Sequence, residues 1–184
     1  ACIITAGKIT MAARTRYAKS WYFFTEPVIF LRQLISEMAG YAHEAYLSDM
    51  LFYARLNGTS DIMWEYLIDM DAFTLDTKGM GGFYDYTKHP FTNRVKANNA
   101  FPEYYHLTYS VDERLNRDLF AGQYLEYGFG VSVVTPERNV KKILKETANL
   151  PSQSFVVDGD LTDFRFADPP RAVVLLKSKG ALLH

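Results

Sequence analysis

The longest hydrophobic pattern in the chain has the period of a helix and runs from Pro27 to Leu56. Its apolar residues recur at intervals of three and four, so they project to one side of a helix. Thr25 suits an N-cap, and Asn57-Gly58 suits a helix end. We therefore predict one amphipathic helix of about 30 residues and about 45 Å, either continuous or broken near Gly40. Its apolar side comprises Val28, Leu31, Leu34, Ile35, Met38, Ala39, Ala42, Ala45, Tyr46, Phe52, Tyr53 and Leu56.

A single carboxylate interrupts this apolar side. Asp49 projects to its centre, one turn from Ala45 and Phe52. An unpaired buried charge is costly, so a buried carboxylate must find a cation, several donors or a metal, or remain protonated. We expect Asp49 to be buried in a salt bridge with Arg14, Arg16 or a base of a partner. The alternative, a catalytic role, requires a second titratable group beside it.

The remaining patterns predict shorter elements. Ser110 and Glu113 form a capping box, S-x-x-E, at the start of one helix, and Thr135-Pro136 begins another. The order strand, helix, strand is typical of a small mixed α/β unit. We therefore predict an α+β fold in which this C-terminal unit follows the long helix. The predicted helices cover residues 61–70 and 110–127 and begin at 135, and the predicted strands cover 104–109, 131–134, 155–157 and 172–176.

Residues 78–100 show no regular period and are rich in glycine, asparagine and proline. Such a stretch is typical of a long loop or a docking segment. Its aromatic residues indicate that it is held against another surface, and we expect Phe83, Tyr84 and Tyr86 to contact a partner. The predicted organisation is a basic N-terminal arm, residues 1–25, and a single α+β domain, residues 26–184, containing the irregular docking segment.

The composition bounds the class of protein. A chain of 184 residues with 48% hydrophobic residues is long enough for one domain with its own core. Its net charge of −1 argues against a dedicated nucleic-acid binder. The aromatic fraction of 15% is high. Aromatic residues are enriched in interface cores, so the excess indicates burial against partners or, alternatively, an aromatic-rich core.

The N-terminal arm is basic and contains no acidic residue. This composition is typical of organelle-targeting segments. The arm leads directly into the run Trp21-Tyr22-Phe23-Phe24, which favours packed structure. We expect Arg14, Arg16, Trp21 and Tyr22 to contact an acidic partner or an anionic membrane surface, the alternative being a solvated terminus. The chain begins at Ala1 rather than methionine, from which we expect processing or a longer product.

Neither a membrane span nor a metal site is predicted. The most apolar run, Trp21 to Leu31, is shorter than the roughly 20 residues that a spanning helix needs. Cys2 is the single cysteine, so the chain can form neither an internal disulfide nor a cysteine metal site. The four histidines, His43, His89, His106 and His184, lack the spacing of metal ligands.

One short pattern indicates a specific chemistry. Leu67 and Ile68 precede Asp69-Met70-Asp71, and Val133-Val134-Thr135 stands before a predicted helix. These segments resemble the first and second motifs of the haloacid dehalogenase-like phosphohydrolases. The resemblance implies that Asp69 is a nucleophile, Asp71 a general acid/base and Thr135 a phosphoryl-binding residue, with Mg²⁺ offsetting the repulsion between phosphate and carboxylate.

Two functions follow as expectations. The first is a non-catalytic structural or accessory subunit of a larger multi-protein assembly, bound to other protein subunits and without a cofactor. We expect this assembly to be a mitochondrial or other organellar membrane-associated complex; a virion shell is another setting with the same requirements. The alternative is a magnesium-dependent phosphohydrolase that uses Asp69 as its nucleophile.

Overall fold

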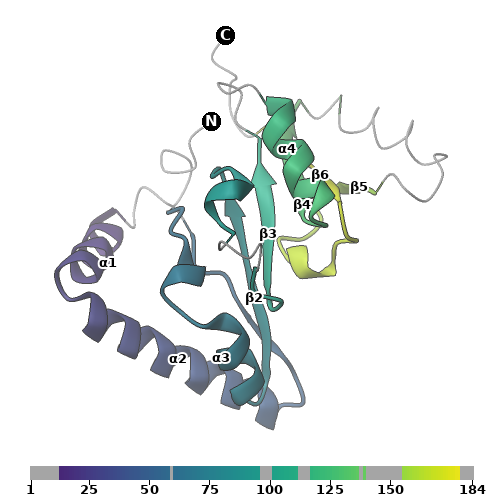
Figure 1. Cartoon of the computed structure of the whole chain (residues 1–184). Coiled ribbons are helices and arrows are strands. Elements are labelled where there is room, and N and C mark those ends of the chain that lie inside the picture. Colours follow the sequence, from purple (N-terminus) through teal and green to yellow (C-terminus); the bar gives the residue numbers. More distant parts are fainter. Residues whose placement is uncertain are drawn as a thin grey trace.

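A six-stranded parallel sheet forms the centre of the molecule (Figure 1). The computed structural model describes residues 13–58, 60–95, 101–111, 117–136, 139 and 155–178. Every strand pair in the sheet is parallel, and the strand order is β1-β2-β3-β4-β6-β5. The fold is therefore α/β. The strands are β1 (Phe52–Ala54), β2 (Met80–Thr87), β3 (Tyr105–Ser110), β4 (Gly130–Thr135), β5 (Val156–Asp158) and β6 (Val173–Lys177).

Three helices pack against one face of this sheet, and a fourth packs beside them. Buried residues of α2, α3 and α4 belong to one cluster with the inward side chains of the strands. By contrast, α1 contacts α2 and has no buried residue. The helices are α1 (Ala13–Thr25), α2 (Pro27–Leu47), α3 (Met70–Asp76) and α4 (Arg117–Glu126), with short 3₁₀ turns η3 (Trp64–Tyr66), η4 (Phe91–Asn93) and η5 (Arg165–Ala167).

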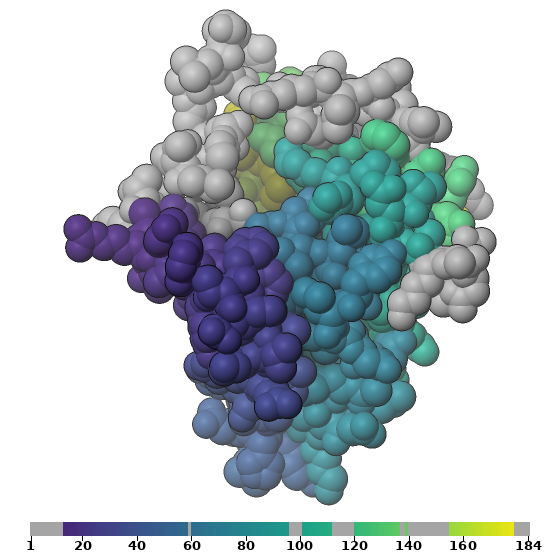
Figure 2. Space-filling view, turned by 60° about the vertical axis from the view of Figure 1, so that its left-hand side comes forward, coloured from purple at the N-terminus to yellow at the C-terminus, as the bar shows by residue number. Residues whose placement is uncertain are grey.

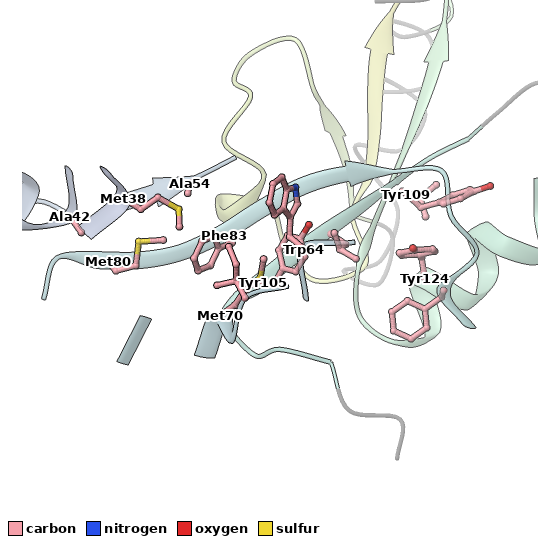
Figure 3. Close-up of a cluster of buried hydrophobic side chains, with 14 residues drawn as sticks. Met38, Ala42, Ala54, Trp64, Met70, Met80, Phe83, Tyr105, Tyr109 and Tyr124 are labelled. Atoms are coloured by element: carbon pink, nitrogen blue, oxygen red, sulfur yellow. The ribbon is translucent and has the colours of Figure 1, made fainter. Parts of the chain in front are cut away.

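The core between helices and sheet is rich in methionine and aromatic side chains (Figure 3). Met38 from α2 and Met70 from α3 lie in the same cluster as Phe83 and Tyr105 from the strands. Farther along the sheet, the rings of Tyr109 and Tyr124 stack at 5.0 Å. Burying a side chain of this size contributes about 1.5–3 kcal/mol. Part of the aromatic excess therefore serves the chain's own core.

The predicted α+β fold with one long helix is wrong, because α2 ends at Leu47 and a strand follows. Asp49 has a φ of 54°, and its amide donates to the carbonyl of Tyr46 while the amide of Met50 donates to that of Ala45. This left-handed end with two crossed hydrogen bonds is a Schellman motif, which satisfies the last carbonyls of a helix. The apolar residues Phe52 and Tyr53 then continue the hydrophobic pattern in β1 rather than in the helix.

The segment predicted to be an irregular loop contains a central strand of the sheet. Residues 80–87 form β2, which pairs with β1 on one side and β3 on the other. Phe83, predicted to contact a partner, is fully buried in the core of this chain. The glycines that favoured a loop have a packing role instead: a side chain on Gly81 would overlap the ring of Tyr53.

Several predicted elements are present with shifted ends. The strands predicted at 104–109, 131–134 and 172–176 correspond to β3, β4 and β6, and residues 156–157 lie in β5. The helix predicted at 61–70 is instead a 3₁₀ turn, η3, followed by the start of α3. Residues 112–116, part of the predicted helix 110–127, lie outside the described residues, as does most of the helix predicted from 135.

Candidate functional site

The sheet has a second face, opposite α2, α3 and α4, and its side chains follow from strand alternation. In β2, Phe83 and Asp85 point toward the helices, so Tyr84 and Tyr86 point to the second face. The parallel register places His106 of β3 beside Tyr84, and Thr108 beside Tyr86. Two adjacent strands thus present two tyrosines, one histidine and one threonine on this face.

Aromatic residues after β5 cover part of the second face. The rings of Phe164 and Phe166 lie 4.9 and 4.8 Å from the ring of Tyr53 in β1. Phe166 also lies 5.8 Å from the ring of His106. These contacts bring residues 164–166, distant in sequence, over β1, β2 and β3. Arg165, between the two phenylalanines, is only 1% exposed.

Buried polar atoms gather at this place. Within the described part of the chain, five of them have neither a hydrogen-bond partner nor an ion-pair contact: Arg55 Nε, Tyr86 Oη, His106 Nε2, Thr108 Oγ1 and Arg165 Nε. Native proteins pair the large majority of their buried polar groups, and leaving one unpaired costs about 1–3 kcal/mol. Five such atoms in one cluster therefore require an explanation. We call these five residues the second-face cluster.

The two arginines of the cluster differ in their charge partners. Arg165 donates through Nη2 to the carbonyl of Thr162, and its Nη1 forms an ion pair with Asp168 Oδ2 at 3.2 Å without the geometry of a hydrogen bond. The guanidinium of Arg55 lies 4.9 Å from the ring centroid of Tyr86. No ion pair joins Arg55 to another described residue. Arg55 therefore has no direct acidic partner in the described structure, and its charge acts on Asp85 only at longer range.

The surroundings also set the protonation of the cluster. Burial raises the pKa of Tyr86; the charges of Arg165 and Arg55 oppose this rise, and Asp163 adds to it. Burial, followed by the charge of Arg165, lowers the pKa of His106 to about 4. At neutral pH Tyr86 is therefore protonated and His106 is a neutral imidazole, which can donate or accept at Nε2 depending on its tautomer.

A pocket of about 350 Å³ adjoins the cluster. His106 belongs both to the cluster and to the pocket wall, and Phe166 joins the pocket to Arg165. The volume lies in the range of small-molecule sites, about 300–1,000 Å³. The lining residues are Phe91, Phe101, Pro102, Glu103, Tyr105, His106, Tyr127, Phe129 and Phe166.

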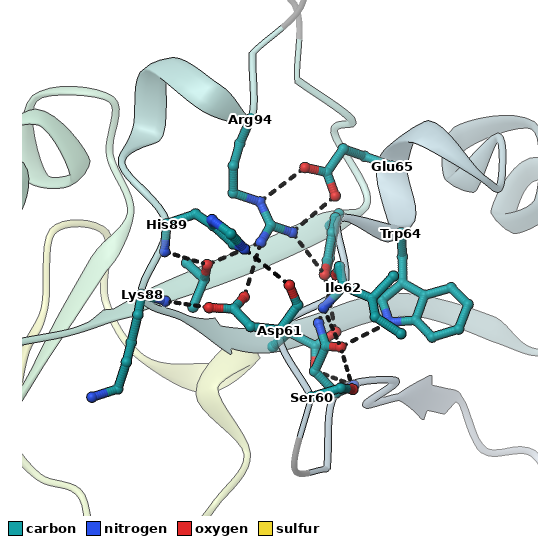
Figure 4. A network of polar contacts seen from close by, with 12 residues as sticks. Ser60, Asp61, Ile62, Trp64, Glu65, Lys88, His89 and Arg94 are labelled. Atoms are coloured by element: carbon teal, nitrogen blue, oxygen red, sulfur yellow. Dashed lines mark hydrogen bonds and ion pairs between the residues drawn. The ribbon is translucent and has the colours of Figure 1, made fainter. Parts of the chain in front are cut away.

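A different polar network lies on the helix side of the sheet (Figure 4). Arg94 is fully buried and donates from Nε and Nη2 to the two carboxylate oxygens of Glu65, both at 2.8 Å. Its Nη1 donates to Thr87 Oγ1 at 2.9 Å and reaches Asp61 at 3.3 Å. Because these donors are all engaged, the network fixes the loops after β1 and β2 rather than offering a site.

Asn57 and Asp85 extend this network. The side-chain oxygen of Asn57 accepts from the amide of Ile62, from Trp64 Nε1 and from Ser60 Oγ. Its backbone amide donates to Asp85 Oδ1 at 2.8 Å. The residue predicted to end a helix thus organises the turn after β1.

The residues of the dehalogenase-like pattern do not come together. Asp69 is the N-cap of α3 and accepts from the amide of Ala72, and the 3₁₀ turn η3, not a strand, precedes it. Asp71 accepts from the amide of Tyr104, just before β3, whereas Thr135 ends β4. Strands that run parallel start at one edge of a sheet and end at the other, so Asp71 and Thr135 lie at opposite edges.

The other predicted site residues lie mostly at the surface. Asp49, expected to be buried, is exposed in the turn after α2. Arg14 and Trp21 are exposed on α1, while Arg16 and Tyr22 are half-buried. Tyr84 and Tyr86, also predicted to contact a partner, are half-buried on the second face, where Tyr84 packs against Phe164 at 6.0 Å.

The sequence did contain one signal for the second-face cluster that we missed. In the segment 105–109 the polar residues His106 and Thr108 alternate with buried apolar or aromatic ones. Such alternation places polar side chains on one face of a strand. No local sequence pattern marks Arg55 or Arg165 as a site residue. They lie together on this face only because the fold brings distant segments of the chain side by side.

Within the described ranges, no group of three or more histidine, cysteine, aspartate and glutamate residues could hold a metal ion. A search of the same ranges finds no helix long and apolar enough to cross a membrane.

Comparison with known proteins identifies the family of the chain. A family model described as Gene product 88 matches residues 1–183, so the chain belongs to this family. No curated protein and no solved structure matches the chain.

Proposed function

We propose that this protein binds a small molecule carrying a phosphate or carboxylate group at the second-face cluster. The observation that carries the proposal is the gathering of five buried, unpartnered polar atoms, counted among the described residues, on one face of a parallel sheet. Two of them, Arg55 Nε and Arg165 Nε, are obligate donors, because a guanidinium has no acceptor. A ligand for these atoms must therefore supply acceptor oxygens.

The location supports the same proposal. Arg55 directly follows β1, and Tyr86 is the last residue but one of β2. Ala54 pairs with Phe83, and Phe83 with Tyr105, so Arg55 lies level with the middle of β2 and the start of β3. Arg55, Tyr86 and Asp168 are half-buried, so a ligand can approach from their side, with Thr108 and Arg165 buried beneath. Because Arg55 forms no ion pair with another described residue, its charge favours an anion over a neutral molecule.

Titration calorimetry with inorganic phosphate and with acetate tests the proposal. We expect Arg55→Gln to weaken anion binding about 10-fold, because a hydrogen bond to a charged group contributes about 1.5–3 kcal/mol. The matched control is Arg32→Gln, which removes the same charge from an exposed position of α2. The absence of anion binding to the wild-type chain, or equal binding by the two variants, would refute the proposal.

We also propose that the protein is a subunit of a larger protein assembly and docks through α1. Tyr17, Trp21 and Phe24 follow one stripe of α1 and are 71%, 61% and 76% exposed. Figure 2 shows α1 and α2, in purple and dark blue, on the outer surface. Contiguous exposed apolar surface marks interaction sites. The exposed bases Arg14 and Lys19 on the same helix favour an acidic partner.

Sedimentation of the full chain and the proteins that co-purify with it test this second function. We expect a stable association that Trp21→Glu abolishes without lowering the melting temperature, because Trp21 is exposed. Ser20→Glu adds the same charge to α1 without removing an aromatic ring, and should keep the association. A chain that sediments as a monomer at every concentration and co-purifies with no protein contradicts the proposal.

A further inference from the structure

The pocket beside the second-face cluster is lined mainly by rings. Phe91, Phe101, Tyr127, Phe129 and Phe166 contribute to its wall. Some of these rings already pack on one another; Phe91 lies 4.3 Å from Tyr127 and 5.4 Å from Phe129. A pocket with such walls suits a flat ring, because aromatic side chains stack on the faces of planar heterocycles.

Two polar groups in the same wall restrict the kind of ring. His106 Nε2 is buried and has no hydrogen-bond partner in the described structure. Its imidazole is neutral at neutral pH, since burial and Arg165 lower its pKa to about 4. The carboxylate of Glu103 is exposed and can accept from an amino group. A purely hydrocarbon ring would leave His106 unsatisfied, whereas the edge of a nucleobase offers both donors and acceptors.

The ring pocket and the anion-binding residues share a wall. His106 is two residues from Thr108 on the same face of β3, and its direct neighbour on β2 is Tyr84. Phe166 contacts His106 at 5.8 Å and is adjacent in sequence to Arg165. Arg55 follows Ala54, which pairs with Phe83, so a ligand with its ring against His106 can extend across β2 toward Arg55.

We propose that the ligand of this protein is a nucleoside phosphate, whose base enters the aromatic pocket against His106 and whose phosphate is held by Arg55 and the neighbouring hydroxyl groups. This inference rests on the proposed anion site. It adds the chemical class of the rest of the ligand and assigns His106 and Tyr127 to base recognition.

Calorimetry with three probes separates the two parts of the ligand: inorganic phosphate, adenosine, and adenosine 5′-monophosphate. Adenine carries an amino group that can donate to Glu103. We expect the wild-type full chain to bind the monophosphate at least 10-fold more tightly than phosphate alone. Arg55→Gln should weaken binding of both. His106→Ala should weaken binding of the monophosphate about 10-fold; because His106 also belongs to the second-face cluster, the selective variant is one outside it.

A second pair of variants keeps the test valid if the His106→Ala variant does not fold. Tyr127 is 51% exposed at the pocket, so Tyr127→Leu removes a stacking ring with little loss of core. It should weaken monophosphate binding selectively, whereas His43→Ala, on the exposed side of α2, should change neither affinity.

Each outcome has a defined meaning. If phosphate binds and the monophosphate binds no more tightly, the nucleoside inference is refuted while the anion site stands. If adenosine binds as tightly as the monophosphate and phosphate does not bind, both the anion site and the nucleoside phosphate are refuted. If Tyr127→Leu and His106→Ala both bind the monophosphate as the wild type does, the base does not occupy this pocket, and the inference is refuted.

Discussion

Asp85 is a carboxylic acid on the buried face of a central strand. It accepts from the amide of Asn57 at 2.8 Å and from the hydroxyl of Tyr105 at 2.9 Å. Burial nevertheless raises its pKa to about 7, against the lowering effect of these two hydrogen bonds and of Arg55 and Arg94. The desolvation of the charge thus outweighs the four favourable contacts, and the carboxylate form is disfavoured below neutral pH.

This pKa predicts a specific pH dependence of stability. The folded pKa lies above the ordinary 3.8, so the folded state binds the proton more tightly than the unfolded state does. The resulting stability is fully present below about pH 4 and is lost as the pH rises through about 7. The difference between the folded pKa of about 7 and the ordinary 3.8 corresponds to about 4 kcal/mol, at about 1.4 kcal/mol per pKa unit. An asparagine side chain cannot ionise, so Asp85→Asn should lack this loss.

Urea unfolding at pH 4, 6 and 8 measures the effect. We expect the free energy of unfolding of the wild type, minus that of Asp85→Asn, to fall by up to about 4 kcal/mol between pH 4 and pH 8. Taking this difference cancels the titration of the other groups. Asp76→Asn, at an exposed position, serves as the control and should show no comparable change. A difference that is constant with pH would contradict the raised pKa.

At the scale of elements, the prediction of one long helix is wrong because two elements, α2 and β1, share one hydrophobic pattern across the turn between them. A strand as short as β1, three residues, shows no alternation that distinguishes it from another helical turn. The deciding residue was Asp49, which we interpreted as a buried charge. Asp and Asn adopt the left-handed conformation more readily than other residues with a side chain, so an aspartate near the end of a periodic run is also compatible with a helix stop.

Strand β2 was hidden for a different reason. Its sequence, MGGFYDYT, lacks the run of branched aliphatic residues that marks a buried parallel strand. Its buried positions include a carboxylate and a threonine whose partners, Tyr105 and Arg94, come from later segments. Strands β4 and β6 were predictable, because GVSVVT and VVLLK carry that aliphatic signature.

The candidate site needs information that single elements do not contain. The alternation around His106 and Thr108 was visible in the sequence, but its importance depends on which strands lie beside β3. Arg55 follows the first strand, whereas Arg165 lies between β5 and β6. Both lie near Tyr86 only because the connection from β5 to β6, which contains η5, passes over the second face of β1, β2 and β3.

At the scale of the molecule, the strands of the sheet differ in how many neighbouring strands and buried side chains hold them in place. Among the described residues, β2, β3, β4 and β6 each have a strand on both sides, and β2 and β3 contribute most of the strand residues in the core cluster. The outer strands β1 and β5 have three residues each and pair with one neighbour. No residue of β5 is fully buried. A strand opens locally at low cost where few buried contacts must be broken, so β1 and β5 should open more readily than β2 and β3.

Hydrogen exchange followed by mass spectrometry tests this distribution. We expect amides of residues 83–87 and 105–110 to exchange only through global unfolding, and those of 156–158 to exchange at least about 100-fold faster, a difference of about 3 kcal/mol in opening free energy. β1 should lie between, because its Ala54 is buried in the core. Since Arg55 directly follows β1, saturating phosphate should slow exchange at 53–57 and leave 156–158 unchanged. Equal protection of the β5 and β2 amides would contradict this prediction, because it would show that further contacts stabilise the outer edge of the sheet.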